Sequence, residues 1–116
     1  MNDILYSLCL HSLNIMDGWT PIPARLIAKD VGVSLYKARK ELCTLKENGY
    51  AYTFSLIIDP EETSLPYHGW GITEAARETE EYKKAAHIEA EICEECFNIP
   101  KSQMLSDLLK GEYDGK

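Results

Sequence analysis

Residues 23–49, PARLIAKDVGVSLYKARKELCTLKENG, constrain the fold most strongly, because they predict two short helices joined by a tight turn. Gly32 stands four residues after Ala28, where the turn needs a residue that tolerates positive φ. Ser34 is a good N-cap for the second helix, and Gly49 stands where a left-handed C-terminal cap is expected. The residues at helical spacing that we expect to face the core are Leu35, Ala38, Leu42 and Leu45.

An alternating segment follows this second helix. Residues 50–59 (YAYTFSLIID) place two kinds of side chain on opposite faces, the apolar Tyr52, Phe54, Leu56 and Ile58 against Ala51, Thr53 and Ser55. This alternation predicts a half-buried strand. Residues 60–66 form a turn-rich loop, so that residues 67–72 (YHGWGI) can return as a second strand. Residues 20–22 lie beside prolines and predict a short edge strand.

The segment WGITEAAR at residues 70–77 resembles the wing-exit motif of winged-helix transcriptional regulators of the MarR and PadR type. In that motif an aromatic and an aliphatic residue end the last strand, and a Thr-Glu pair starts the next helix. Ala76 stands where the family often has Gly. Together with the run S-x-x-x-A-x-x-x-L-x-x-L-x-x-x-G, the resemblance covers residues 19–77. It implies an α+β, mainly α fold, a winged helix-turn-helix with a small antiparallel hairpin and a long C-terminal helix.

The chain of 116 residues is long enough to bury a core without disulfides or metals. We expect a winged helix-turn-helix domain over residues 1–72, a C-terminal helical extension over 73–110 that serves as a dimerisation element, and a frayed tail over 111–116. The expected elements are helices over 4–15, 24–30, 35–47, 73–97 and 101–110, with a hairpin over 50–72.

The net charge of −7 opposes DNA binding, but the charge is unevenly distributed. Residues 19–49 hold six basic against three acidic side chains, whereas residues 59–116 hold six basic against fourteen acidic ones. Exposed charges farther apart than about 8 Å are largely screened from one another at physiological salt. A local basic patch on an acidic protein can therefore bind phosphate, although the acidic remainder weakens that binding.

Two helices that cross at such a turn present the outer face of the second one to the major groove of DNA. Tyr36, Lys37 and Lys40 lie in its first two turns and are the expected base readers. The full DNA-binding set that we predict is Arg25, Lys29, Ser34, Tyr36, Lys37, Arg39, Lys40 and Thr44. The alternative is that this mixed-charge helix face is simply solvated.

The predicted wing departs from the family pattern. Its loop contains Asp59, Glu61 and Glu62 and no basic residue, so the negative potential of a minor groove would repel it. Two functions from different classes therefore stay open. The first is a sequence-specific DNA-binding transcriptional regulator that acts as a homodimer on double-stranded DNA. The second is a winged-helix interaction module that binds a protein partner through the acidic wing or the C-terminal helix and does not bind DNA.

The long helix expected over residues 73–97 starts at Thr73 as N-cap and carries two apolar stripes. One stripe is enough to pack the helix on its own domain. The second stripe is the expected dimer interface and consists of Ala85, Ile88, Ile92 and Cys96. The alternative is that the C-terminal segment folds back over this stripe through Met104, Leu105, Leu108 and Leu109.

The remaining candidate groups favour neither catalysis nor metal binding. The four cysteines, Cys9, Cys43, Cys93 and Cys96, are expected to be small buried side chains, since one C-x-x-C is only half of a zinc site. His11 and His68 are isolated and carry no signal. We find no nucleophile–base pair and no Gly-rich phosphate loop, so we expect no enzymatic activity, no cofactor and no metal. The N-terminus resembles no signal peptide, so we expect a cytoplasmic protein that does not engage a membrane.

Overall fold

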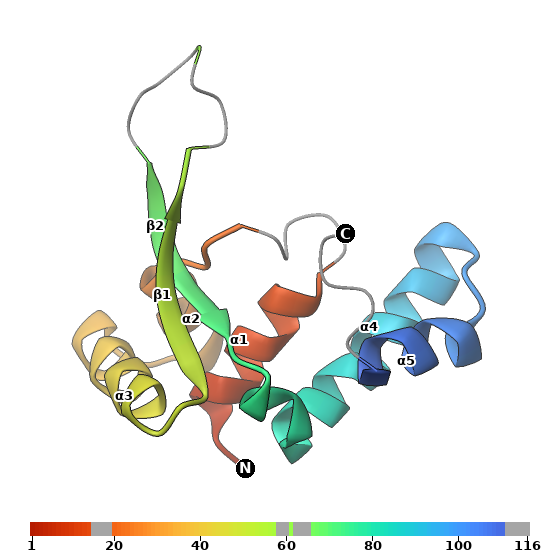
Figure 1. The fold of residues 1–116 in the computed structure, drawn as a ribbon, viewed down its shortest axis with the longest axis horizontal. Coiled ribbons are helices and arrows are strands. Elements are labelled where there is room, and N and C mark those ends of the chain that lie inside the picture. Colours follow the sequence, from red (N-terminus) through yellow and green to blue (C-terminus); the bar gives the residue numbers. More distant parts are fainter. Residues whose placement is uncertain (15–19, 58–60, 62–65, 111–116) are drawn as a thin grey trace.

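The computed structural model describes residues 1–14, 20–57, 61 and 66–110. Three N-terminal helices are followed by a hairpin and then by further helices, so the expected mainly helical α+β fold is confirmed (Figure 1). The described elements are α1 (Asp3–Leu13), α2 (Ala24–Val31), α3 (Leu35–Glu47), β1 (Ala51–Leu56), β2 (Tyr67–Ile72), the 3-10 helix η1 (Ala75–Glu78), α4 (Glu80–Phe97) and α5 (Lys101–Lys110). No helix among these described residues combines the length and the apolar character that crossing a bilayer requires.

The turn between α2 and α3 has the predicted geometry. Gly32 ends α2 at φ 79° in the left-handed region, and its N–H donates to the Ala28 carbonyl at 2.9 Å. Ser34 then caps α3, because its Oγ accepts the Lys37 N–H at 3.1 Å. Gly49 follows the end of α3 at φ 85°, as expected of a left-handed residue after a helix.

The hairpin is antiparallel, and its register pairs Ala51 with Ile72 at the base and Leu56 with Tyr67 at the far end. Ile22 bridges Trp70 through two backbone hydrogen bonds of 3.0 and 2.8 Å, so the short edge strand predicted over residues 20–22 is observed only as an isolated bridge at Ile22. Gly69 permits this approach, since a Cβ at that position would lie 2.6 Å from the Ile22 carbonyl oxygen. The hairpin projects away from the helices (Figure 1).

At its base the hairpin reverses the faces that the alternation of residues 50–59 implies, whereas farther along β1 the half-buried Phe54 and Leu56 and the exposed Thr53 and Ser55 follow that alternation. Ala51 is buried, whereas Tyr52 on the opposite face is 44% exposed. The Tyr52 and Phe54 rings lie over Gly71, with their centroids 5.4 Å apart. The reason is tertiary: the core touches the hairpin only at its base, where the small Ala51 fits, and the projecting part has no helix over the aromatic face. Ile58 lies outside the described residues.

The prediction of one continuous helix over residues 73–97 is wrong, because the structure has a 3-10 helix, η1, followed by α4. The Thr73 hydroxyl donates to the Gly49 carbonyl at 2.5 Å, so Thr73 fastens the hairpin base instead of capping a helix. A short 3-10 turn follows, and the chain is extended at Thr79, with φ −82° and ψ 158°. Thr79 is the observed N-cap of α4, because its Oγ1 accepts the Tyr82 N–H at 3.2 Å. The first helix is also shorter than expected and ends at Leu13.

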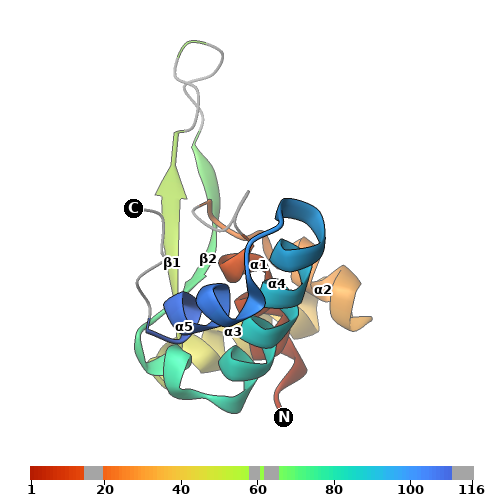
Figure 2. The ribbon, with the colours of Figure 1, turned by 90° about the vertical axis from the view of Figure 1, so that its right-hand side faces the viewer.

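The C-terminal helix α5 packs along α4, as both ribbon views show (Figures 1 and 2). Met104 and Leu108 are buried, and the buried Tyr82 hydroxyl donates to the Leu108 carbonyl at 2.5 Å. The C-terminal segment therefore folds back on α4 through these two residues, but it leaves Ile92 and Cys96 of the second stripe exposed. Since α1 also packs on α4, core residues from 1–72 and from 73–110 belong to one hydrophobic cluster.

Candidate nucleic-acid interface

The exposed face of α3 follows the predicted helical projection closely. Ala38, Leu42 and Leu45 are buried, and Tyr36 on the opposite side is 77% exposed. Lys37, Arg39, Lys40 and Thr44 are also exposed. Leu35, which we expected to face inward, is 37% exposed and lines a groove beside the helix. Its position in the first turn, at the edge of the α2 contact, leaves it without a neighbour on its outer side.

Two hydroxyl groups of the predicted DNA-binding set are engaged within α3 itself. Ser34 Oγ accepts the capping hydrogen bond from Lys37, and Thr44 Oγ1 donates to the Lys40 carbonyl at 3.2 Å. Ser34 therefore holds the start of the helix in place. Its O–H group is still able to donate to a phosphate, because the cap uses only an oxygen lone pair.

Five basic side chains of α2 and α3 are exposed and have no partner among the described residues. No ion pair or hydrogen bond between described residues engages Arg25, Lys29, Lys37, Arg39 or Lys40. The nearby carboxylate of Asp30 is occupied by a side-chain contact with His11 of α1. Within the part of the chain that the structure describes, these five cations on the two helices therefore lack a compensating side chain.

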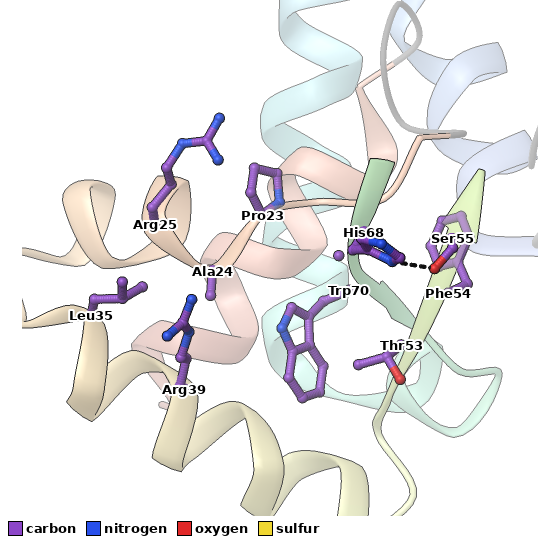
Figure 3. A pocket seen from close by; sticks show the side chains of 11 residues that line it. Pro23, Ala24, Arg25, Leu35, Arg39, Thr53, Phe54, Ser55, His68 and Trp70 are labelled. Atoms are coloured by element: carbon purple, nitrogen blue, oxygen red, sulfur yellow. Dashed lines mark hydrogen bonds between the residues drawn. The ribbon is translucent and has the colours of Figure 1, made fainter. Parts of the chain in front are cut away.

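A groove of about 470 Å³ lies between the start of α2, α3 and the hairpin, and we call it the α3–hairpin groove. Arg25 and Arg39 come from two different helices and stand opposite His68 and Ser55 of the hairpin (Figure 3). Ser55 Oγ and His68 Nδ1 are joined by a hydrogen bond of 2.5 Å. The described residues that line the groove are Pro23, Ala24, Arg25, Leu35, Arg39, Thr53, Phe54, Ser55, His68, Gly69 and Trp70.

The hairpin wall of this groove was not predicted from the sequence. His68 was expected to be isolated, and Ser55 and Trp70 were expected only as members of the two strands. A signal was present, since Thr53 pairs with Trp70 and Ser55 with His68 across an antiparallel hairpin, which places all four on one face. The direction in which this face points depends on tertiary packing, and that information is not local.

The acidic wing is described only in part. Glu61 is exposed, whereas Asp59 and Glu62 lie outside the described residues.

Lys46 at the end of α3 donates to the Thr53 hydroxyl at 3.3 Å and so connects the helix to the base of β1. The position of α3 relative to the hairpin is thus fixed by a polar contact as well as by the core.

The expected dimer stripe on α4 is divided by the fold. Ala85 is fully buried within the protomer and presents no surface to a second copy, so we exclude it from any interface. Ile88 is half-buried, Ile92 is 44% exposed and Cys96 is exposed. The buried end of the stripe lies where α1 and α5 flank α4, and the exposed end lies toward the C-terminus of the helix.

The four cysteines divide evenly. Cys9 and Cys93 are buried as expected, but Cys43 on the outer face of α3 and Cys96 on α4 are exposed, so the expectation was wrong for these two. Burial, assisted by the charge of Glu81, raises the pKa of the Cys9 thiol to about 12. Burial also raises the pKa of the Cys93 thiol, with smaller contributions from Glu89 and Cys96. In the part of the chain that the structure describes, no three His, Cys, Asp or Glu side chains gather as metal ligands.

In the comparisons with known proteins, no protein-family model, no curated protein and no solved structure matches the chain.

Proposed function

We propose that this chain is a winged helix-turn-helix DNA-binding protein that acts as a sequence-specific transcriptional regulator. The observation that carries the proposal is the set of five exposed cations on α2 and α3, the helices joined by the Gly32 turn, with which no described residue pairs. In this arrangement α3 enters the major groove, and the hairpin lies over the adjacent backbone.

In this proposal the side chains of α3 and those of α2 contact different parts of the DNA. Tyr36, Lys37 and Lys40 extend from its first two turns and contact base edges in this proposal. Arg25 and Lys29 project from α2 and contact phosphates, which position the protein without reading sequence. Because the whole chain carries −7, we expect binding that is weak at physiological salt and much tighter at low salt.

A homodimer stays part of the proposal, now on a smaller surface. With Ala85 excluded, the proposed dimer interface on α4 consists of Ile88, Ile92 and Cys96. A dimer with two-fold symmetry would place two copies of α3 on a palindromic DNA site. Sedimentation equilibrium at tens of micromolar tests this part separately. A monomer there, with DNA binding intact, removes the dimer and keeps the DNA proposal.

Fluorescence anisotropy with a labelled duplex from the region upstream of the protein's own gene tests the function. We expect affinity to fall about 10²–10³-fold between 50 and 200 mM salt if four to five phosphates are neutralised. Lys37→Ala with Lys40→Ala should weaken binding and reduce sequence preference, since these residues are the proposed readers. Lys83→Ala on α4 is the matched control and should leave binding unchanged.

A second candidate function is supported by the exposed aromatic face of the hairpin. Tyr52 and Tyr67 lie on the same face of the two-stranded sheet and are 44% and 55% exposed. Such a face is suited to a protein partner. If the intact protein binds no duplex even at low salt, the DNA-binding proposal fails, and this interaction-module function becomes the better account.

A further inference from the structure

The outer edge of β1 has no neighbouring strand among the described residues. The backbone N–H and C=O of Trp70 bond to Ile22, so Trp70 directs these groups away from β1. In an antiparallel pair the residue opposite, Thr53, therefore directs its own backbone groups away from β2. Ser55, two residues on, does the same. Both residues are exposed, and no described residue bonds to these backbone groups.

This edge lacks the features by which natural proteins keep exposed strands apart, which are mainly Lys, Pro or a bulge. Residues 50–57 and 67–72 contain no Lys, Arg, Asp, Glu or Pro, and the register runs without a bulge along both described strands. A hairpin of two strands is only marginally stable alone in water, and this one projects away from the helices (Figure 1). The edge is therefore suited to pairing with another strand.

We propose that the free edge of β1 pairs with β1 of a second copy of this chain, antiparallel and about a two-fold axis at Ser55. The position of the axis follows from burial. Ala51 is buried at the base of the hairpin and closes the edge there. Thr53, Ser55 and the following Ile57 are exposed and leave the rest of the edge open. With Ser55 opposite Ser55, Thr53 of each copy bonds to Ile57 of the other.

Side chains and charge favour a second copy as the occupant of this edge. The same pairing places Phe54 of each copy opposite Leu56 of the other, at the closely spaced positions where cross-strand side chains contact. The two chains run in opposite directions, so the exposed Glu61 that follows each β1 lies far from its copy. The whole chain carries −7, and the uncharged strands are a surface on which two copies can approach without repulsion between the paired segments.

The proposed contact is closed. Ile22 already occupies the outer edge of β2 at Trp70, and a two-fold contact uses the same β1 edge on both copies, so this pairing by itself stops at a dimer. It is separate from the α4 surface of Ile88, Ile92 and Cys96, and it does not require DNA binding.

The pairing has a consequence for the proposed function, and only this step rests on that function. A two-fold axis perpendicular to the sheet keeps both copies of α3 on one side of it. The two copies of Ala51, at the bases of the hairpins where α3 packs, lie about 27 Å apart, since about eight residue steps of about 3.4 Å separate them along the strands. This separation is of the order of the about 34 Å between successive major grooves on one side of B-DNA. The pairing is therefore compatible with a palindromic site.

Cross-linking at position 55 tests the axis directly. Residues of a hydrogen-bonded antiparallel pair have Cα atoms about 5.5 Å apart, a separation that a disulfide can span. With the exposed thiols removed by Cys43→Ser and Cys96→Ser, Ser55→Cys should form an intermolecular disulfide in oxidised glutathione. Thr53→Cys is the matched control on the same strand, because its two copies would lie about 13 Å apart. Equal rates at the two positions, or no disulfide at position 55, would overturn the proposal.

Amide hydrogen exchange of the unmodified chain, resolved by NMR, tests the edge without a substitution. Interfaces that bury less than about 1,200 Å² are typically weak, so we expect a Kd on the order of 10–100 µM. The amides of Thr53, Ser55 and Ile57 should then exchange about threefold to fivefold more slowly near 1 mM protein than near 20 µM. Ser55→Lys places like charges opposite each other and should remove this dependence on concentration, whereas Ser55→Thr should keep it.

The outcomes separate this proposal from the DNA function. If the edge amides of the parent exchange at the same rate at both concentrations, the strand pairing fails, even where duplex binding is measured by anisotropy. If they slow with concentration in the parent but not in Ser55→Lys, and no duplex binds, the pairing stands and the DNA function fails.

Discussion

The basic side chains of α2 and α3 and those of the C-terminal helices are used in opposite ways. On α4 and α5 they act within the molecule: Lys101 pairs with Glu91 at 2.9 Å, Lys83 with Glu80 at 3.8 Å, and the Lys84 ammonium lies 4.9 Å from the centre of the Tyr6 ring. On α2 and α3, five cations point into solvent with no described partner. The fold thus compensates positive charge where α4 and α5 pack together and leaves it available on α2 and α3.

The paired basic side chains of α4 and α5 bear on the stability of the fold, whereas the exposed ones of α2 and α3 bear on ligand binding. Exposed ion pairs contribute only about 0–1 kcal/mol each, so the Lys101–Glu91 pair matters mainly by orienting α5 against α4. The unpaired cations of α2 and α3 contribute no attraction to the fold, and they repel one another weakly. An anionic ligand is what gives such a cluster a favourable energy, which is why the comparison supports the binding proposal.

The largest expected effect tests the packing that holds the unpaired cations in place. Ala38 is fully buried where α3 crosses the core, so Ala38→Asp should lower the free energy of unfolding by about 3–5 kcal/mol through burial of an unpaired charge. Lys40→Asp is the control, because it introduces the same group on the exposed face of the same helix. Thermal melts that place both variants beside the parent would contradict the assignment of the buried face.

The sequence was sufficient for the α2–α3 unit because its signals are local. Gly32 at positive φ, the Ser34 cap and the spacing of Ala38, Leu42 and Leu45 each act within a few residues. The start of α4 was not predictable in the same way, since Thr73 and Thr79 are both followed by Glu and both suit an N-cap. In the structure the Thr73 hydroxyl donates to the Gly49 carbonyl, a short 3-10 turn follows, and Thr79 caps α4.

The candidate site was predictable in its helical half and not in its hairpin half. Arg25, Lys37 and Lys40 were identified because charge on the outer face of a helix follows from helical spacing alone. His68 was missed because its role depends on which face of the hairpin turns toward α3. The burial of Ala51 in place of Tyr52 shows that the apolar alternation was misleading at the base of the hairpin, where the core is in contact.

The N-caps of α3 and α4 provide a second test of the comparison between the two regions, because each cap should contribute about 1 kcal/mol to the free energy of unfolding. Ser34→Ala removes the cap of α3, and Thr79→Ala removes that of α4. The loss should be greater for Thr79→Ala, because the Thr79 hydroxyl also donates to the Ala76 carbonyl at 2.6 Å and so joins η1 to α4. Ser34→Asp and Thr79→Ser keep a capping oxygen and should preserve most of the unfolding free energy in chemical denaturation. Equal losses from the capless and cap-preserving variants would argue against capping as the cause.

The unpaired cations themselves should contribute almost nothing to folding. Replacing Lys37 and Lys40 together with Gln should change the free energy of unfolding by no more than about 0.5 kcal/mol, since neither side chain has a described partner. The same variant should weaken duplex binding strongly, because two of the proposed DNA contacts are lost. A marked loss of stability in urea would show that these lysines are structural, and the contrast with α4 and α5 would then disappear.

The smallest expected effect concerns the paired cation Lys101. The hydrogen bond from Lys101, together with its charge, holds the pKa of the Glu91 carboxyl below its usual value. A carboxyl with a lowered folded-state pKa stabilises the fold above its unfolded pKa, and this stabilisation is lost as the pH falls through the folded value. Lys101→Met should therefore lower the melting temperature slightly near pH 7, and this difference should shrink as the pH falls through the folded-state value and Glu91 becomes protonated. Lys83→Met, whose ion pair with Glu80 is longer at 3.8 Å, should show a still smaller change near pH 7. A Lys101→Met deficit that persists undiminished at low pH would mean that its side chain stabilises α5 by packing and not through Glu91.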